Sequence, residues 1–430
     1  MDDAQILDRM REDWNRRAAE DANYYVAFRR RDQDEDEFFA MGAPELERLE
    51  ADLPRLPGRD AALEIGCGPG RLMRPLSRHF KEIHGVDVSD AMIALARERL
   101  RSTPNAFPHH SSGSDLNLFP DEKFDFVFSY AVFQHIPSAD VVFQYLREAR
   151  RVLKTGGIVQ CQVNGLPPTA RQVDTWNGVH ISPREIAKFA LQNDFQLLGL
   201  EAIDAQYMWV TLRKRPAGWL DSLAGRHFES AASIRNVTNA VTTHHPVTPS
   251  SGPMAALSLW IERLPDECDL NHMAVSVDGV PGRVEFIGTP RNGAQRVNVW
   301  LPEGTRTGMV PVDVTWLERT ICPTTWTRIV PPGPSVPRLA AVTDGVNLQL
   351  HQRTESGIVK VTIIEVPPAE QFHATVDGKP VSDTESVCTD RIQRRYEFNL
   401  RMPEGVGPGG HVLRFAIGKR EFPPMGIEVA

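Results

Sequence analysis

The sequence predicts an α/β domain in the first half of the chain, followed by two all-β domains. Strand-like and helix-like segments alternate up to about residue 215, which is typical of a mostly parallel sheet covered by helices on both faces. After residue 255, helical periodicity is scarce, and short β-rich runs are separated by Pro, Gly and Asp turns. A set of short motifs recurs in this second part and indicates that the β domain is duplicated.

The domain boundaries follow from these changes in pattern, and the length of 430 residues suits two to four domains. We expect the α/β domain at 1–215, a connector at 216–255, a first β domain at 256–330 and a second at 335–430. The connector is expected because residues 242–253 are rich in Thr, Pro and Ser, a composition typical of linkers.

Seven short runs within the first 215 residues are predicted as strands: 61–65, 82–88, 106–110, 124–130, 157–163, 195–203 and 207–214. Helices are predicted at 1–20, 44–53, 71–80, 90–101, 141–153 and 183–192. Ser89-Asp90 and Ser182 are good N-caps, and Pro183 suits a first helical turn. The last two strands follow each other after a short connection, so we expect them to be antiparallel.

Three motifs recur in order in the β-rich part. The residues 259–262, 277–279 and 302–304 match 362–365, 376–378 and 403–405, at offsets of 103, 99 and 101 residues. Val-Asp-Gly at 277–279 and 376–378 predicts a hairpin turn in each copy. The alternative is a chance resemblance between common turn tripeptides.

Composition excludes several classes of protein. The fractions of hydrophobic (41%) and charged (24%) residues are those of a globular chain. The net charge of −8 argues against a general nucleic-acid binder. No apolar run reaches the ~18 residues of a membrane span, and the charged start predicts no secretory signal. The five cysteines form no CxxC pair, which favours a reduced, cytoplasmic protein over a disulfide or zinc framework.

The most informative motif is LEIGCGPGR at 63–71, a glycine-rich turn between a predicted strand and a predicted helix. Glycines let the backbone turn tightly and approach a ligand closely. Asp87, 17 residues past Gly70, ends the second predicted strand. In a doubly wound sheet this position lies beside the first loop and can accept hydrogen bonds from the hydroxyls of a ribose. Together, loop and aspartate predict a nucleotide-type site.

The spacing Glu64-x-Gly66-x-Gly68-x-Gly70 resembles motif I of the class I S-adenosylmethionine methyltransferases. The resemblance covers about residues 40–215 and continues through VDVSDAMIALAR (86–97), SDLNLFPDEKFDFVFSYAVFQHI (114–136) and LREARRVLKTGGIV (146–159). It implies a doubly wound, seven-stranded, mostly parallel sheet, methyltransferase activity and S-adenosylmethionine as cofactor. The duplicated β domains resemble immunoglobulin-like sandwiches of the IPT/TIG kind.

The same resemblance implies roles for individual residues. The three glycines would shape the loop under the methionine part of the cofactor, and Glu64 would orient that loop. Asp87 would bind the ribose. The residues expected around adenine are Val88, Met92, Asp115 and Leu116, and those expected near the cofactor's ammonium group are Ser129 and Gln134. Cys67 is expected only to pack.

On the acceptor side, His135 is a candidate general base, because an imidazole titrates near neutral pH. The alternative is that His135 merely packs or caps its loop. Further candidate substrate contacts are Gln162, Asn164, Trp176 and His180, together with Tyr24 and Tyr25 of an N-terminal segment (1–40) that would act as a lid. We expect no metal, because Ser129 and Tyr130 stand where an acidic pair would be needed.

The acceptor is expected to be a small molecule or a sugar, since the NPPY signature of nucleic-acid and protein amine methylation is absent after the strand at 124–130. O-methylation is favoured because His135 could serve as its base. The alternative is an assembly or glycan-binding protein that acts through its β domains and retains a vestigial methyltransferase scaffold. In either case the β domains could pair protomers into a homo-oligomer.

Overall fold

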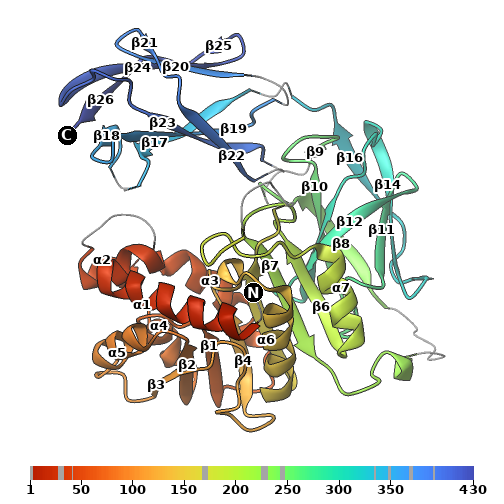
Figure 1. Cartoon of the computed structure of the whole chain (residues 1–430). Coiled ribbons are helices and arrows are strands. Elements are labelled where there is room, and N and C mark those ends of the chain that lie inside the picture. Colours follow the sequence, from red (N-terminus) through yellow and green to blue (C-terminus); the bar gives the residue numbers. More distant parts are fainter. Residues whose placement is uncertain are drawn as a thin grey trace. The chain divides into compact units, whose positions relative to one another are not determined.

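The computed structural model describes residues 3–27, 33–40, 42–166, 173–223, 231–242, 247–333, 336–346, 350–367, 371–390 and 393–430. The chain divides into two compact units (Figure 1). The first comprises residues 1–20 and 39–332, and the second comprises residues 21–38 and 333–430. Helix α1 is interrupted at Asp21, where the backbone is extended, and this is where the chain passes from one unit to the other.

The α/β part of the first unit contains seven strands in the order β3-β2-β1-β4-β5-β7-β6 (Figure 1). Their bounds are β1 (Ala61–Ile65), β2 (Glu82–Asp87), β3 (Ala106–His110), β4 (Phe124–Ser129), β5 (Leu153–Val163), β6 (Phe195–Glu201) and β7 (Met208–Lys214). The first five strands pair in parallel, and β7 is antiparallel to both β5 and β6. The predicted fold class, including the antiparallel end of the sheet, is therefore confirmed.

Helices cover both faces of this sheet, because alternate strand residues point to opposite sides. The helices of the chain are α1 (Asp3–Ala27), α2 (Glu35–Ala40), α3 (Ala43–Ala51), α4 (Met73–Leu76), α5 (Asp90–Arg99), α6 (Ala139–Val152) and α7 (Pro183–Gln192). Leu63 and Val127 belong to a core with α6 and α7, whereas Ala62 and Phe126 belong to a core with α3, α4 and α5. The sheet is thus doubly wound.

Local sequence explains where three of the helices begin. Ser89, Ser138 and Ser182 each accept a hydrogen bond from a backbone amide of the helix that follows, and Ser182 forms a capping box with Glu185. The helix predicted at 71–80 is shorter than expected and consists of α4 followed by a 3-10 turn at 77–79. Pro75 explains the late start, since its ring excludes a helical carbonyl four residues earlier.

The first β domain also belongs to the first unit. Its strands are β8 (Ser233–Asn239), β9 (Val247–Pro249), β10 (Ala256–Glu262), β11 (Met273–Val277), β12 (Val280–Ile287), β13 (Ala294–Trp300), β14 (Gly308–Trp316), β15 (Arg319–Thr320) and β16 (Thr325–Val330). Two of them, β8 and β9, lie in the range expected to be a connector, where β8 pairs with β10 and β9 pairs with β16. Neither strand was predicted, because both sequences are mostly polar and strands at a sheet edge need little apolar surface.

The second β domain repeats the first. Its strands are β17 (Arg338–Asp344), β18 (Arg353–Thr354), β19 (Ile358–Ile364), β20 (Phe372–Val376), β21 (Lys379–Pro380), β22 (Thr384–Asp390), β23 (Arg395–Arg401), β24 (Gly409–Ile417), β25 (Arg420–Glu421) and β26 (Met425–Val429). The order β17-β19-β23-β22 corresponds to β8-β10-β13-β12 of the first copy. Asp278 and Asp377 both adopt positive φ, as the repeated Val-Asp-Gly turn requires. Both β regions fit immunoglobulin-like domains.

The α/β domain and the first β domain are joined through the edge strand β6. Phe286 of β12 pairs with Gly199 of β6, so that the two domains share one 16-stranded sheet. The Gln196 amide donates to the carbonyl oxygens of Asp266 and Cys268, both at 2.7 Å. The first β domain is therefore a fixed part of this unit.

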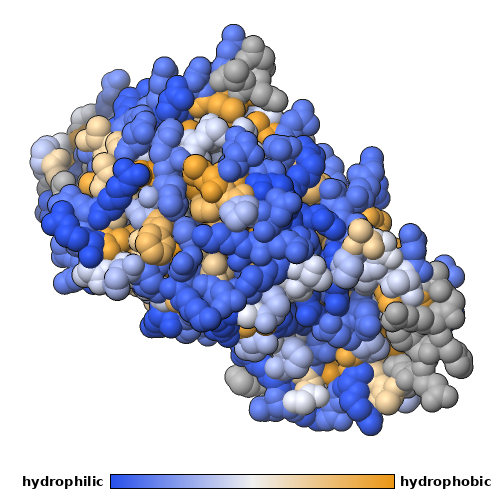
Figure 2. All heavy atoms as spheres, turned by 90° about the horizontal axis from the view of Figure 1, so that it is seen from below, coloured by the Kyte–Doolittle hydropathy of each residue, from blue (hydrophilic) through white to orange (hydrophobic). Residues whose placement is uncertain are grey.

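Among the described residues, no helix is both long and apolar enough to cross a membrane. The face shown in Figure 2 is mainly hydrophilic, and its hydrophobic residues form separate small groups. Small exposed apolar groups of this kind are ordinary on globular proteins.

Candidate functional site

The glycine-rich loop follows β1 at the carboxyl edge of the sheet. Gly66, Gly68 and Gly70 all have positive φ (+74°, +49° and +85°). A Cβ at Gly66 would lie 2.3 Å from a side-chain carbon of Val132. The amides of Gly66 and Cys67 donate to the carbonyl oxygen of Val86, which ties the loop to the end of β2. Glycine is therefore required here both by conformation and by space.

Asp87 ends β2 and turns its carboxylate to this loop. Its Oδ2 accepts from the Gly68 amide at 2.9 Å, and its Oδ1 accepts from the Ser89 amide at 2.8 Å. Burial raises the pKa of Asp87, while these two amide hydrogen bonds lower it. A carboxylate has about four lone pairs, so two remain to accept hydrogen bonds from hydroxyls. The role of ribose ligand stays a prediction, but the side chain lies where that role needs it.

Glu64 is the buried acid before the loop, only 4% exposed. Its Oε2 is enclosed and has no hydrogen-bond partner. Burial raises the pKa of Glu64 well above its usual value, against the lowering effect of the Arg71 charge; Asp87 raises it further. A buried polar atom without a hydrogen-bond partner destabilises the folded protein unless a ligand supplies that partner. This carboxyl therefore suits a cationic ligand group.

The residues predicted around adenine lie beyond Asp87. Met92 and Leu116 are fully buried, whereas Val88 is half-buried. Asp115 is occupied within its own turn, where it accepts from the Ser112 hydroxyl at 2.7 Å and from the Asn117 amide at 3.0 Å. An additional adenine contact from its carboxylate stays a prediction.

The end of β4 contributes the next group. The hydroxyl of Ser129 donates to the carbonyl oxygen of Ile65 at 2.9 Å, which joins β4 to β1 at the loop. Ala131 adopts a positive φ of 56°, and its amide donates to Oε1 of Gln162 at 3.0 Å. Gln162, expected to contact substrate, thus holds this unusual turn. Gln134 is buried with its Oε1 unpartnered.

His135 follows on the 3-10 turn η3 (Phe133–His135). Its Nδ1 lies 2.8 Å from the carbonyl oxygen of Trp176, and its Nε2 lies 3.3 Å from Nε2 of Gln134. Since a carbonyl can only accept, Nδ1 carries the proton and Nε2 is the basic nitrogen. Burial lowers the pKa of His135 to about 4, opposed by the Trp176 hydrogen bond and deepened by the charge of Arg17.

The loop after β5 lies against η3. Asn164 donates from Nδ2 to the carbonyl oxygen of Gly178 at 3.1 Å, and Gly178 in turn donates from its amide to the carbonyl oxygen of Gln134. The ring of Trp176 lies 5.2 Å from that of His135. Nδ1 of His180 is buried without a partner. Asn164 therefore positions the loop, and direct contact of these residues with substrate stays a prediction.

Helix α1 packs over the same edge of the sheet, and two of its residues at the site, Trp14 and Asn15, were not predicted from the sequence. Asn15 accepts, through Oδ1, from the Ser89 hydroxyl at 2.7 Å and from the Ala91 amide at 3.2 Å. The Trp14 ring lies 5.5 Å from that of His135. No motif marks these residues, because their importance comes only from what the helix packs against.

The lid expected at 1–40 is divided between the two units. Residues 3–20 of α1 belong to the first unit, whereas Tyr24 and Tyr25 belong to the second. There the Tyr24 hydroxyl donates to the carbonyl oxygen of Val346 at 3.1 Å. The role of these two tyrosines as substrate contacts stays a prediction.

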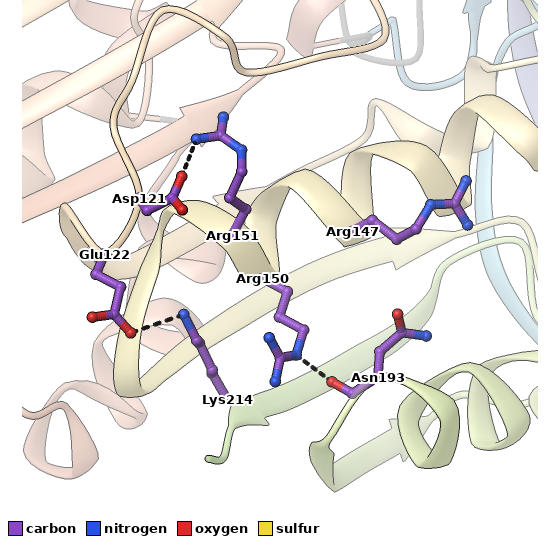
Figure 3. Close-up of a pocket in the computed structure, with 7 residues that line it drawn as sticks. All are labelled: Asp121, Glu122, Arg147, Arg150, Arg151, Asn193 and Lys214. Carbon is purple, nitrogen blue, oxygen red and sulfur yellow. Dashed lines mark hydrogen bonds and ion pairs between the residues drawn. The ribbon is translucent and has the colours of Figure 1, made fainter. Parts of the chain in front are cut away.

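A separate, strongly charged cavity of about 530 Å³ lies at the start of β4 and β5 and the end of β7 (Figure 3). Its lining residues are Asp121, Glu122, Arg147, Arg150, Arg151, Asn193 and Lys214. Arg151 pairs with Asp121 and Lys214 pairs with Glu122 (Figure 3), and Arg147 and Arg150 give the lining an excess of positive charge. Because ligands of doubly wound sheets bind at the carboxyl ends of the strands, this cavity at the amino ends of β4 and β5 is not the cofactor site.

Sheet order, glycine loop and aspartate position together point to one family, and residues 63–161 match the family described as Methyltransferase domain. This part of the chain is a class I methyltransferase domain that uses S-adenosylmethionine. The methyltransferase domain is similar to the ubiquinone biosynthesis O-methyltransferase of Cereibacter sphaeroides, with 28% identity over 189 residues that cover 42% of this chain and 72% of the relative.

Two further similarities concern different methyltransferases. Phosphoethanolamine N-methyltransferase 2 of Caenorhabditis elegans is 36% identical over 105 residues, which cover 24% of this chain and 23% of the relative. A solved geranyl diphosphate C-methyltransferase from Streptomyces coelicolor A3(2) aligns with a TM-score of 0.34 and 16% identity, over 42% of this chain and 81% of its own.

The described residues of the methyltransferase domain fit the cofactor. Three features suit a cationic nucleoside. They are the unpartnered buried carboxyl of Glu64, a loop in which a Cβ at Gly66 or Gly70 would clash with neighbouring side chains, and the Asp87 carboxylate beside that loop. Among residues that the structure describes, no group of three or more His, Cys, Asp or Glu side chains is placed to hold a metal ion.

Proposed function

We propose that this chain transfers a methyl group to a hydroxyl oxygen of a small molecule, with His135 as the general base. The observation that carries the proposal is the hydrogen bond from His135 Nδ1 to the Trp176 carbonyl oxygen. It places the proton on Nδ1 and leaves Nε2, which lies 3.3 Å from the Gln134 side-chain nitrogen, as the nitrogen that can accept a proton. The similarity to a ubiquinone biosynthesis O-methyltransferase supports an oxygen acceptor, whereas the N-methyltransferase relative covers a shorter segment.

When bound, S-adenosylmethionine supplies a methyl group that is already activated on a sulfonium centre. The protein then has to align the acceptor and help to remove its proton. His135 Nε2 would take the proton of the acceptor hydroxyl while the oxygen gains the methyl group. The low pKa of His135 keeps its imidazole neutral, and therefore able to accept, at every pH above about 4.

Cofactor binding is proposed for the residues predicted from the resemblance. Asp87 would hold the ribose hydroxyls, and Glu64, the Ser129 carbonyl and Gln134 would meet the ammonium group. Gly66, Gly68 and Gly70 would allow the close approach of the loop. Val88, Met92 and Leu116 would pack around adenine, with Asp115 at its edge.

Several finer points belong to the same proposal. A sugar acceptor fits His135 chemistry as well as another hydroxyl does, and the β domains would pair protomers into a homo-oligomer. All five cysteines are free, which supports a reducing, cytoplasmic setting.

The alternative of a vestigial scaffold is not favoured, because the domain match coincides with the glycine loop and Asp87.

Isothermal titration with S-adenosylmethionine and with S-adenosylhomocysteine tests the cofactor site, and micromolar binding of both is expected. Transfer of a radiolabelled methyl group to a panel of catechol, phenol, sugar and primary-amine probes then tests the acceptor class. His135→Gln should reduce transfer to the best probe about 10²-fold or more and leave S-adenosylhomocysteine binding unchanged. His373→Gln, an exposed histidine of β20, is the matched control. Transfer to amines alone, or full activity of His135→Gln, would overturn the proposal.

A further inference from the structure

A buried polar cluster joins helix α1 to the turn at 174–177. The hydroxyl of Thr175 donates to Oδ2 of Asp13 at 2.6 Å, and Nη2 of Arg17 donates to the same hydroxyl at 3.3 Å. Nη1 of Arg17 also donates to the Thr175 carbonyl oxygen at 3.2 Å. Thr175 is 2% exposed, and Asp13 and Arg17 are each 9% exposed. One threonine therefore connects an acid and a base of α1 to the turn.

Aromatic contacts reinforce this connection. The Arg17 guanidinium lies 4.7 Å from the centre of the Trp14 ring and 5.1 Å from that of the Trp176 ring. Such cation–π contacts are stronger when the cation is removed from water, as it is here. The rings of Trp14 and Trp176 in turn both lie next to His135. Helix α1 and the turn thus form one packed body around the imidazole.

The turn itself is held in a defined conformation. Oδ1 of Asp174 accepts from the amides of Trp176 and Asn177, both at 2.7 Å, and the Asp174 amide donates to the Asn177 carbonyl oxygen. A displacement of Thr175 must therefore move the Trp176 carbonyl as well. That carbonyl is the group that holds the proton on His135 Nδ1.

We propose that Thr175 is a positioning residue that couples the docking of α1 to the tautomer of His135. When α1 is docked, Asp13 and Arg17 hold Thr175, the Trp176 carbonyl faces Nδ1, and Nε2 is the basic nitrogen. When α1 leaves, the turn loses these bonds and both tautomers become accessible. His135 is thereby held entirely in the tautomer with a basic Nε2 only while α1 is docked. This inference rests on the proposed role of His135 in methyl transfer.

The experiment that tests this proposal measures the tautomer of His135. The full chain is labelled with ¹⁵N at its histidines, and the ¹⁵N chemical shifts show which ring nitrogen is protonated. The variant His135→Gln identifies the signals of His135. Wild-type protein and Thr175→Ser, which keeps the hydroxyl, should show Nδ1 protonated and Nε2 unprotonated. Thr175→Val, which keeps the shape but removes the hydroxyl, should show a mixture of both tautomers. Thr320→Val, at an exposed site on β15, is the matched control.

Binding of S-adenosylhomocysteine shows whether each variant is folded, and Asp13→Asn provides a second way to weaken the bond to Thr175. A shift toward mixed tautomers in Thr175→Val and Asp13→Asn, but not in Thr175→Ser, supports the coupling. If the His135 tautomer is unchanged in both Thr175→Val and Asp13→Asn, the proposed coupling is overturned. If the tautomer changes while methyl transfer to the probe does not, the coupling stands and the proposed base role fails.

Discussion

Nδ1 of His135 lies 2.8 Å from the carbonyl oxygen of Trp176, which is 41 residues later in the chain. This contact decides which nitrogen of the imidazole can accept a proton. It also joins the turn after β4 to the loop after β5, the two loops that flank the expected acceptor position.

Asp87→Asn should weaken the binding of S-adenosylhomocysteine about tenfold to a hundredfold. The charged oxygens that would hold the ribose are lost, and hydrogen bonds to a charged group contribute about 1.5–3 kcal/mol each. Isothermal titration measures the change. Asp90→Asn, an exposed residue at the start of α5, serves as control and should bind as wild type. Equal affinity of Asp87→Asn and wild type would contradict the assignment.

Stability should fall as the pH falls from about 6.5 to about 4, in part because of His135. Its folded-state pKa is lowered to about 4 from an ordinary value of 6.5. Between these values the unfolded chain binds a proton that the folded chain does not, so the free energy of unfolding rises with pH across this window. Thermal unfolding at pH 4.5 and 7 measures it, and His135→Gln should make the difference smaller. An unaltered difference in the variant would refute this account.

Glu64→Gln should raise the melting temperature at pH 8 and weaken binding of S-adenosylmethionine about tenfold or more, the equivalent of about 1.4 kcal/mol. The pKa of Glu64 is raised in the folded state, so the folded protein keeps Glu64 protonated at pH values at which the unfolded chain is ionised. The free energy of unfolding therefore falls as the pH rises from the ordinary pKa of a glutamate toward the raised one. Glutamine mimics the protonated form without this loss. Glu98→Gln, on the exposed face of α5, is the control. A lower melting temperature at pH 8 would show that the buried carboxylate is stabilising.

Removal of everything after residue 250 should prevent stable folding, whereas a chain ending at residue 332 should remain folded and bind S-adenosylhomocysteine. The shorter chain keeps β8 but loses β10, its pairing partner, and it exposes the edge of β6. It also leaves the Gln196 amide and the buried Asp52 carboxylate without their partners at Asp266, Cys268 and Thr289. Circular dichroism and size-exclusion chromatography compare the two, and a monomeric, cooperatively folding 1–250 chain would disprove the fixed junction.

Much of the methyltransferase domain could be predicted from local sequence. The glycine loop, the strand ends and the caps at Ser89 and Ser182 depend on residues a few positions apart, so their pattern is visible in the chain. The position of Asp87 beside Gly68 follows from the topology of one strand–helix–strand unit. In contrast, β8 and β9 escaped prediction because their pairing partners, not their own polar sequences, make them strands.

The doubly wound sheet, the duplicated β domain and the glycine-rich loop could be predicted from the sequence, because backbone conformation and hydrophobic periodicity are local properties. The contact between Thr175 and Asp13, which are 162 residues apart, and the hydrogen bond from the Ala131 amide to Gln162 are visible in the folded structure alone. Such contacts depend on how helices and loops pack at the edge of the sheet. That packing is a property of the whole fold and leaves no mark in the spacing of residues along the chain.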